Sequence, residues 1–340
     1  MKKVLTIIVP TYNMELYLRY SLSSLLIKEE DRSKLDIIIV NDGSKDNSLN
    51  IAYEYQNLYP DAFRVIDKEN GNYGSCINAA LPKAAGKYIK ILDADDSFNT
   101  NNLADYVLFL ENNNYDLVLT DFDIVDNNRK TSSTCSFPFP TGKGLSIRDI
   151  ANTNAFKGMQ MHAVTYRTDI LLCLQYKQTE GISYTDQEWV FAPMINIKDI
   201  YYYNKTIYRY LWGREGQTMS PAVRTKQIGD LITCLFSILD VWVCSQKIIT
   251  NNIKDYLLYR ILFAAKEIYT TCFLNYSIQI RDILKKFDCN LKDKNPYIYT
   301  YIAEQGKTIF KNNYIGIWRK FPNTPIAIVK VLCKLYFRLF

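Results

Sequence analysis

Four short runs of β-branched residues recur along the first hundred residues, and each is followed by a segment long enough for a helix. The runs lie at residues 4–9, 36–40, 63–66 and 88–92. Between them, apolar residues recur about every 3.6 positions, the spacing that places them on one face of a helix. Strands that alternate with helices join through right-handed crossovers, so the strands are parallel. The sequence therefore predicts an α/β fold, a mainly parallel sheet with flanking helices, continued by a helix at about 101–112 and a strand at 117–120.

After residue 121 the alternation of strands and helices loosens. Residues 131–144 are rich in Ser, Thr, Pro and Gly, which is typical of a loop or a hairpin. From residue 223 onward the apolar spacing predicts several helices rich in Leu, Ile, Tyr and Phe. A chain of 340 residues has the length of about two domains. We therefore expect a first domain at 1–222, with halves at about 1–125 and 126–222, and a helical C-terminal region at 223–340.

The net charge of +6 is distributed unevenly between these two parts. Residues 1–222 carry 23 Lys and Arg against 27 Asp and Glu, a net charge of −4, whereas residues 223–340 carry 18 against 8, a net charge of +10. The acidic first part argues against nucleic acid as a partner. Near the end of the chain, at about 324–340, Lys330, Lys334 and Arg338 recur every fourth residue among apolar residues.

This spacing predicts a basic amphipathic helix, which suits a peripheral contact with an anionic membrane surface. A terminal helix docked on the rest of the helical region fits the same pattern. No stretch offers about 18 uninterrupted apolar residues, so a conventional membrane-spanning helix is not expected. The basic amphipathic tail is therefore the feature from which we predict membrane contact.

The cysteines and the N-terminus point to a cytoplasmic protein. The eight cysteines include no C-x-x-C pair, and the single His162 cannot complete a Cys/His zinc site with standard spacing. Scattered buried thiols are typical of a reducing cytosol. The first residues, MKKVLTIIVPTYN, have too short an apolar run for a signal peptide and no small-residue cleavage site. We expect this segment to be a buried first strand.

Polar loops follow all four predicted strands. In a parallel sheet the ligand lies outside the carboxyl ends of the strands, so these loops converge at one edge. They span residues 10–15, 41–44, 67–74 and 93–96. In the last loop Asp93, Asp95 and Asp96 repel one another unless a cation or a proton relieves them. Carboxylate oxygens suit Mg²⁺ or Mn²⁺, and Mg²⁺ commonly joins one or two carboxylates to substrate phosphates.

Each loop alone has a simpler interpretation. Asp95 or Asp96 can cap the helix that follows, Asp42 and Gly43 favour a turn, and residues 11–13 can form a helix cap. Together, however, the loops place acceptors and small hydroxyls beside an acidic metal site. That combination suits the base, ribose and diphosphate of a nucleotide.

Four ordered motifs give the chain a specific resemblance. They are Val9-Pro10-Thr11-Tyr12-Asn13, Val40-Asn41-Asp42-Gly43-Ser44-x-Asp46, Asn70-Gly71-Asn72-x-Gly74 and Leu92-Asp93-Ala94-Asp95-Asp96. In this order and spacing they resemble the family 2 glycosyltransferases, which have the GT-A fold. The resemblance is tight over about 3–125 and looser up to about 220. It implies that a sugar is transferred from a nucleotide sugar to an acceptor, with inversion and with the help of a divalent metal, Mn²⁺ or Mg²⁺.

The resemblance also implies roles for individual residues at the donor site. Pro10, Thr11, Tyr12, Asn13 and Glu15 match the first nucleotide-binding loop, and Asp42 matches the residue that contacts the base. Asp93 and Ala94 match positions that reach the ribose or the donor sugar, Asp95 matches the metal-binding carboxylate, and Asp96 supports them. Many relatives carry an arginine in the third loop that neutralises phosphate. Here that arginine is missing, and Lys68 or Asn72 is the expected partial substitute.

On the acceptor side, Thr185-Asp186-Gln187-Glu188-Trp189 resembles the motif that carries the general base. We expect Asp186 to accept the proton of the acceptor hydroxyl, with Glu188 as the second candidate and capping of the following helix as the structural alternative. In the later loop, Arg214 or Arg209 would stabilise the leaving diphosphate, unless they serve only an exposed salt bridge. His162, in an apolar context, is expected to line the core or the acceptor wall.

The resemblance thus predicts a transferase that uses a UDP-sugar and a glycan or lipid-linked acceptor in bacterial surface polysaccharide synthesis. It would work in the cytoplasm, on the inner face of the cell membrane. One alternative is a non-catalytic nucleotide-sugar-binding scaffold subunit at the membrane, because the third loop lacks its arginine. Another is a phosphohydrolase that uses D-x-D as nucleophile and acid. That chemistry places the motif on the first strand, whereas here it follows the fourth.

Overall fold

The computed structural model describes residues 2–214, 216–217, 220–305, 314–325, 327–328 and 331. The chain divides into two compact units. The first comprises residues 1–215 and 245–256, and the second comprises 216–244 and 257–340. The boundary expected at 222 falls in the segment 216–244 of the second unit.

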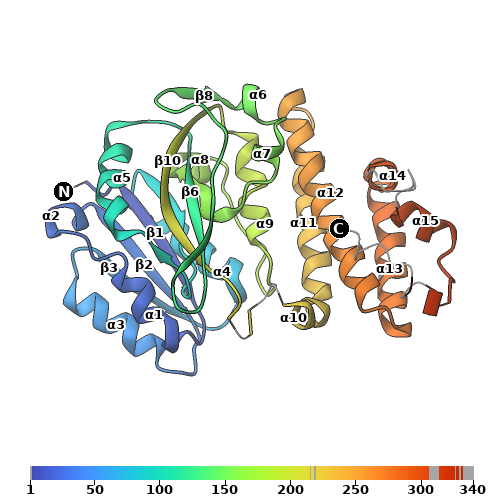
Figure 1. The fold of residues 1–340 in the computed structure, drawn as a ribbon, viewed down its shortest axis with the longest axis horizontal. Helices are drawn as coiled ribbons and strands as arrows, with labels where there is room; N and C mark the ends of the chain where they lie inside the picture. The colour runs from blue at the N-terminus through green and yellow to red at the C-terminus, as the bar shows by residue number, and fades with distance from the viewer. Residues whose placement is uncertain are drawn as a thin grey trace. The chain divides into compact units, whose positions relative to one another are not determined.

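The first unit is an α/β structure around one sheet (Figure 1). Its strands are β1 (Leu5–Thr11), β2 (Leu35–Asp42), β3 (Phe63–Lys68), β4 (Tyr88–Ile91), β5 (Ser97–Phe98), β6 (Leu117–Val125), β7 (Thr131–Cys135), β8 (Gly144–Ser146), β9 (Val164–Arg167) and β10 (Asp199–Leu211). Its α-helices are α1 (Glu15–Ser23), α2 (Glu29–Arg32), α3 (Ser48–Leu58), α4 (Asn72–Ala80), α5 (Thr100–Asn112), α6 (Ile147–Ile150), α7 (Asn154–Lys157), α8 (Thr168–Cys173) and α9 (Asp186–Trp189). The predicted strands and helices of residues 4–120 are confirmed.

The strand order is β3-β2-β1-β4-β9-β6-β10-β5, with β7 paired to β6 and β8 paired to β10. β1, β2, β3 and β4 are parallel, and Ile7 lies opposite Ile37 in the register of β1 and β2. Both side chains are fully buried, as are Leu5, Ile38 and Ile39, because a parallel sheet is covered on both faces. This apolar layer is the core that fixes the loops at the ends of the strands.

One short strand, β9, changes the pattern in the middle of the sheet. β9 lies between β4 and β6 and is antiparallel to both, while β10 is parallel to β6. β4, β6 and β10 therefore run in the same direction as β1, and their carboxyl ends lie at the same edge of the sheet. As a result, residues near 93, 125 and 211 come together although they are far apart in the sequence.

The second unit contains helices α10 (Pro221–Lys226), α11 (Ile228–Ser245), α13 (Ile278–Lys294), α14 (Pro296–Glu304) and α15 (Tyr314–Lys320), together with most of α12 (Asn251–Leu274). Its core is aromatic, with Tyr269 packed against Phe287 and Trp318 at ring-centroid distances of 5.5 and 6.0 Å. A buried ion pair between Arg319 and Asp288, at 2.7 Å, joins α15 to α13. The predicted helical C-terminal region is confirmed over these residues.

Two membrane-related expectations concern this region. By length and composition alone, α11 could cross a membrane, although 44% of it is buried in the described structure and a core helix would pass the same test. Sequence analysis did not single out this helix as a membrane-span candidate, because its apolar residues do not form an uninterrupted stretch. Most of the predicted amphipathic helix at 324–340 lies outside the residues that the structure describes.

Candidate functional site

The loops after β1 and β2 hold each other in place through reciprocal hydrogen bonds. The Asn13 backbone N–H donates to Ser44 Oγ at 3.1 Å, and the Lys45 backbone N–H donates to Asn13 Oδ1 at 2.8 Å. Glu15 makes a second such pair, since its backbone N–H donates to Asp46 Oδ2 at 2.9 Å and its Oε2 accepts from Asn47 N at 2.8 Å. Asn13 adopts a left-handed conformation, φ 53°, which asparagine tolerates. Asn13 and Glu15 therefore shape the first donor loop.

A pocket of about 790 Å³ opens beside these loops, at the carboxyl ends of β2 and β3. Tyr12, which is 47% exposed, lines it together with Asn41, Gly43, Ser44, Lys45, Leu49, Asp67, Lys68, Glu69 and Asn70. Asn41 donates to Asp67 Oδ1 at 2.7 Å, while its buried Oδ1 has no hydrogen-bond partner in the described structure. The pocket has the size of a small-molecule site. Pro10 and the buried Thr11 do not line it, although they lead into it.

Asp42 is buried behind this pocket, and its carboxylate already has several donors. Lys68 Nζ lies 2.7 Å from Asp42 Oδ1, the Gly71 backbone N–H donates to the same oxygen at 2.9 Å, and Asn70 donates to Oδ2 at 3.0 Å. Asp42 thus fastens the third loop to β2. Since Asp42 holds the Lys68 ammonium group, Lys68 is poorly placed to replace the missing arginine. Asn72 begins α4, directly after this loop.

The three aspartates after β4 lie in one tight turn, with the buried Ala94 between the first two. The Asp96 backbone N–H donates to the Asp93 carbonyl at 2.9 Å, which closes the turn. Asp96 is completely buried, and its two oxygens accept hydrogen bonds from Tyr208 Oη and Leu211 N, both at 2.6 Å. Asp96 therefore anchors β10 to the turn, in agreement with a supporting role.

Asp93 lies at the open side of the turn and accepts a hydrogen bond from Tyr73 Oη at 2.9 Å. Burial raises the pKa of Asp93 from 3.8 to about 7, and the charges of Asp95 and Asp186 act in the same direction. A bound cation would lower the pKa of this carboxyl group, because a cation stabilises the charged carboxylate.

Asp95 forms a buried ion pair with Arg214 of the loop after β10. The guanidinium group of Arg214 also lies over the Tyr17 ring, 5.4 Å from its centroid. On the other side, Arg129 donates to the Asp95 carbonyl at 2.8 Å, and Arg209 in turn donates to the Arg129 carbonyl at 2.7 Å. Arg214 is therefore the predicted arginine that reaches the acidic turn, whereas Arg209 acts on the backbone of Arg129.

His162, in the segment just before β9, lies beside the acidic turn. One ligand atom each from Asp93, Asp96 and His162 lie within 4.8 Å of one another. Burial lowers the pKa of His162 to about 3, so its imidazole is neutral and able to act as a ligand. Lys90, buried beneath, donates to the His162 carbonyl at 2.7 Å and holds this segment. The expectation that His162 lines the core is compatible with this position.

Asp186 is the first residue of α9 and faces the same turn. Burial is the main cause of the raised pKa of Asp93 and of Tyr73, and the charge of the nearby Asp186 acts in the same direction on both. Its Oδ2 accepts a hydrogen bond from Gln187 Nε2 at 3.1 Å. The structure thus brings Asp186 to the carboxylates at 93–96, which precede it by about ninety residues in the chain.

Sequence reasoning did not single out Tyr73, Tyr208 and Tyr210, whose rings or hydroxyls contact these carboxylates or His162. A usable signal was the alternation of aromatic residues at 208, 210 and 212, which places them on one face of a strand.

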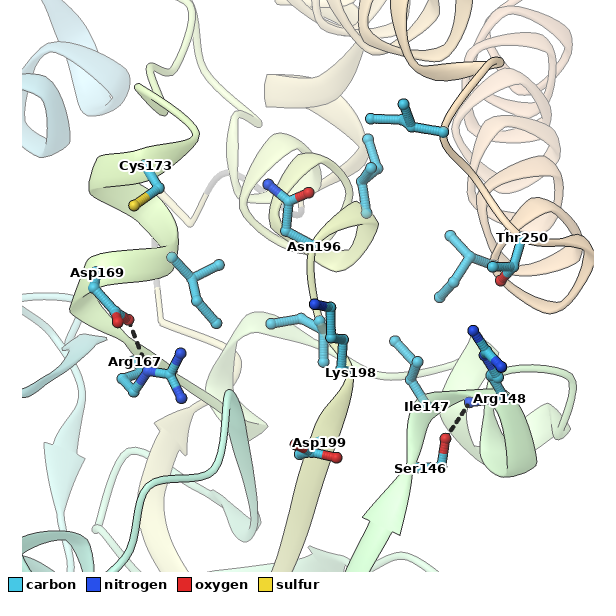
Figure 2. A pocket seen from close by; sticks show the side chains of 15 residues that line it. Ser146, Ile147, Arg148, Arg167, Asp169, Cys173, Asn196, Lys198, Asp199 and Thr250 are labelled. Atoms are coloured by element: carbon cyan, nitrogen blue, oxygen red, sulfur yellow. Dashed lines mark hydrogen bonds and ion pairs between the residues drawn. The ribbon is translucent and has the colours of Figure 1, made fainter.

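A second pocket, of about 650 Å³, lies at the opposite edge of the sheet, near the start of β10 (Figure 2). Its walls include Ile147, Ile170 and Ile197, and Arg167 at its margin is paired with Asp169 at 2.7 Å. None of the predicted site residues lines it. The candidate site is therefore the carboxyl edge, where the acidic turn and the first pocket both lie.

Comparison with known proteins agrees with this fold. Residues 6–171 match the model of the family described as Glycosyl transferase family 2. Over this matched part the chain therefore belongs to glycosyltransferase family 2. It is 28% identical over 218 residues to the poly(ribitol-phosphate) beta-N-acetylglucosaminyltransferase TarS of Staphylococcus aureus strain MW2, an alignment that covers 64% of this chain and 37% of TarS.

Two further relatives match shorter segments. An uncharacterized glycosyltransferase of Mycoplasma pneumoniae is 41% identical over 29% of this chain and 34% of its own length. The minor teichoic acid biosynthesis protein GgaA of Bacillus subtilis is 37% identical over 29% of this chain and 23% of its own length. The alignments thus span only about a quarter to two fifths of these relatives' lengths.

The similarity to solved structures extends over the whole fold. Residues 1–349 of S. aureus TarS, crystallised with UDP-GlcNAc, superpose with a TM-score of 0.70 at 20% identity, covering 98% of this chain and 92% of that one. The mannosyltransferase PcManGT of Pyrobaculum calidifontis, in complex with GDP-Man and Mn²⁺, superposes with a TM-score of 0.51 at 16% identity, covering 89% and 85%. These superpositions confirm the predicted GT-A fold followed by a helical C-terminal region.

Proposed function

We propose that this chain transfers a sugar from a UDP-sugar to a glycan or lipid-linked acceptor, with inversion and with a divalent cation. One observation carries the proposal. The acidic turn at 93–96, the Asp186 carboxylate and Arg214 lie at one edge of the sheet, and a pocket of about 790 Å³ opens at the same edge. A donor diphosphate, a reacting sugar and an acceptor hydroxyl need these groups side by side.

The donor set at this edge fits Mg²⁺ or Mn²⁺. Carboxylate oxygens predominate, which suits these hard cations, and a neutral imidazole is a further ligand for Mn²⁺. Asp95 and Asp93 are the proposed ligands, because both oxygens of Asp96 already accept hydrogen bonds. When bound, the cation would neutralise charge on the donor diphosphate.

Arg214 is paired with Asp95 Oδ2 in this structure. A cation that binds Asp95 through this oxygen would compete with the guanidinium group. We therefore propose that Arg214 leaves Asp95 when the donor binds and then contacts the diphosphate. There it would stabilise the charge that develops as the sugar–phosphate bond breaks.

Asp186 is the proposed general base. It would accept the proton of the acceptor hydroxyl while the hydroxyl oxygen attacks the anomeric carbon and the electron pair of the breaking bond passes to UDP. Attack from the face opposite to UDP inverts the configuration. Tyr12, Asn41 and the rest of the first pocket would hold the uracil and ribose. Pro10, Thr11, Asn13, Glu15, Asp42 and Asn72 would shape that pocket.

The relatives support the choice of substrates. TarS is named for transfer of N-acetylglucosamine to poly(ribitol-phosphate), and GgaA is named for teichoic acid biosynthesis. A UDP-sugar donor and a bacterial surface polymer as product are therefore proposed here as well. We place the enzyme in the cytoplasm, at the inner face of the cell membrane, where lipid-linked acceptors are made.

Donor turnover tests this proposal against the scaffold alternative. Purified protein is incubated with UDP-GlcNAc, UDP-glucose and other UDP-sugars, with Mn²⁺ or with EDTA, and UDP release is measured with and without a pool of glycan acceptors. Transfer that requires the cation and falls in Asp95→Asn supports the enzyme. UDP binding by calorimetry without transfer to any acceptor would support the non-catalytic scaffold instead.

A further inference from the structure

A row of aromatic rings on β10 leads outward from the acidic turn. Tyr208, Tyr210 and Trp212 alternate along the strand and its extension, so they share one face. Tyr208 is buried and donates to Asp96, and the Tyr210 ring stacks on His162 with centroids 4.4 Å apart. Tyr210 and Trp212 are in edge contact, with ring centroids 5.9 Å apart. The first two rings thus support the site, and the third lies at the outer end of the row.

Trp212 is held in place and yet uncovered. Its backbone N–H donates to the Val125 carbonyl at 2.9 Å, and two residues later Arg214 is paired with Asp95. Its side chain is nevertheless 51% exposed, whereas the other three tryptophans of the chain, Trp189, Trp242 and Trp318, are at most 6% exposed. A fixed indole ring presents a large flat apolar surface with a polar N–H at its edge, which is a common binding element.

The inner end of this row faces the proposed base. Burial raises the pKa of Tyr210, and the nearby carboxyl groups of Asp96, Asp93, Asp95 and Asp186 act in the same direction. An acceptor whose hydroxyl meets Asp186 would therefore extend across Tyr210 toward Trp212. The Asp186 carboxylate disfavours an anionic group beside it, because like charges repel.

We propose that Trp212 is a stacking platform for a neutral pyranose ring of the acceptor. This inference rests on the proposed function and defines its acceptor more narrowly. A pyranose presents its C–H groups on one flat face, which can cover the indole, while its hydroxyls at the rim remain available to Asp186. An open-chain polyol phosphate has no such face and carries charge into an acidic site. The acceptor would therefore end in a sugar ring, in contrast to a bare polyol phosphate.

Tryptophan fluorescence tests the platform without any turnover. Since Trp212 is the one exposed tryptophan of the four, it should account for most quenching by acrylamide in the wild-type protein. In the presence of UDP, methyl β-D-glucopyranoside should reduce this quenching, and ribitol 5-phosphate at the same concentration should not. Trp212→Phe should lose both the quenchable component and the ligand effect. Equal protection by ribitol 5-phosphate, or no protection by the pyranoside, would overturn the proposal.

Kinetics provide a second, separate test. Trp212→Ala should raise the acceptor KM by about three- to tenfold, the range expected for one aromatic stacking contact, and leave the UDP affinity unchanged. Leu172→Ala is the matched control. Leu172 is 47% exposed, close to the 51% of Trp212, but it lies on α8, away from the acidic turn. An unchanged acceptor KM in Trp212→Ala contradicts the platform. If the pyranoside protects Trp212 but no variant transfers sugar, the platform stands and the proposed transfer fails.

Discussion

Two acidic residues of the short helix α9 have different surroundings, and these separate their roles. Glu188 is 4% exposed, and its two oxygens accept hydrogen bonds from the Thr179 backbone N–H at 2.8 Å and from Thr179 Oγ1 at 2.6 Å. Asp186 is partly exposed and acts electrostatically on Asp93. A general base must reach the substrate, which a buried and fully hydrogen-bonded carboxylate does not. Glu188 therefore holds the loop before α9, and Asp186 stays our candidate for the base.

Replacing Asp186 by Asn should lower the transfer rate by about 10²- to 10⁴-fold, the usual contribution of a general base. UDP affinity, measured by calorimetry, should not change, because the proposed role of Asp186 is to act on the acceptor. Glu188→Gln should instead lower the free energy of unfolding by about 1–3 kcal/mol, since it disturbs a buried hydrogen-bonded group. Asp105→Asn, at an exposed carboxylate, serves as the control. Wild-type turnover in Asp186→Asn would exclude it as the base.

The high pKa of Asp93 predicts how stability depends on pH when no metal is bound. The folded protein keeps a proton on Asp93 up to about pH 7, whereas the unfolded chain loses it near pH 4. The free energy of unfolding should therefore fall as pH rises between these values. Asp93→Asn should remove the Asp93 part of this slope, as measured by urea unfolding at a series of pH values.

A divalent metal ion bound at Asp93 should instead raise the free energy of unfolding at high pH. At pH 8, added Mn²⁺ should raise the urea midpoint of the wild type more than that of Asp93→Asn, because only the wild type presents this charged ligand. The exposed Asp105→Asn variant should behave as the wild type in both experiments. A pH slope in Asp93→Asn equal to that of the wild type would show that Asp93 ionises normally.

The positions of the predicted site residues in the fold were easier to predict than their hydrogen-bond and ion-pair partners. Asp42, Asp93 and Asp95 follow buried strands, so their place at the sheet edge follows from the alternation of strands and helices. Their contacts do not. Lys68 is 26 residues from Asp42 and Arg214 is 119 residues from Asp95. Local spacing contains no information on such pairs, because tertiary packing decides them.

At the level of elements, the same limit applies to the middle of the sheet. Strands β1 to β4 are neighbours in sequence and follow the crossover rule, and they were predicted. β9 was not, because it has four residues, runs against its neighbours and enters the sheet between β4 and β6 from a segment that begins at residue 164. This insertion brings His162 beside Asp93 and Asp96, so the environment of His162 could not be anticipated.

Helix α4 connects the donor side to the segment that precedes Asp186. Asn78 on α4 donates to the Gln178 carbonyl and accepts from the Gln178 backbone N–H, at 2.8 and 2.9 Å. At Gly74 the helix comes so close to this segment that an added Cβ would lie 2.2 Å from the Thr179 carbonyl oxygen. Only glycine allows this approach.

Gly74→Ala should therefore force α4 away from Thr179 and lower the free energy of unfolding by about 1–3 kcal/mol, the usual cost of overpacking. Because this segment leads to Asp186, kcat should fall as well. Gly229→Ala on α11 is the matched control, since no atom lies within 4 Å of the added Cβ. It should leave kcat unchanged and unfold no more easily than the wild type. Equal stability of the two variants would contradict close packing at Gly74.

At the scale of the whole molecule, the two parts of the chain carry net charges of opposite sign. The first 222 residues have a net charge of −4 and hold the acidic turn, whereas residues 223–340 have a net charge of +10. In the proposed reaction, a cation at the acidic turn and the anionic donor diphosphate would compensate each other there. The positive second part has no such counterpart in the proposed reaction. An anionic membrane surface is the partner that its charge and its apolar end favour.

Membrane binding should therefore be peripheral and electrostatic. The full chain should float with vesicles that contain anionic phosphatidylglycerol, and high salt should release it, because salt screens such attraction. Replacing Lys330, Lys334 and Arg338 together by Gln should weaken binding by about 10²-fold, since each basic residue near the surface contributes about 1 kcal/mol.

A matched triple variant at Lys28, Lys130 and Lys143, also to Gln, separates position from total charge, and it should bind as the wild type. Equal losses in the two triple variants would mean that net charge alone attracts the protein. Binding that resists salt and requires detergent for release would mean that α11, which is long and apolar enough, enters the bilayer. Release by salt together with loss of binding in the Lys330, Lys334 and Arg338 variant would place the contact at the tail, because only those charges distinguish it from the control.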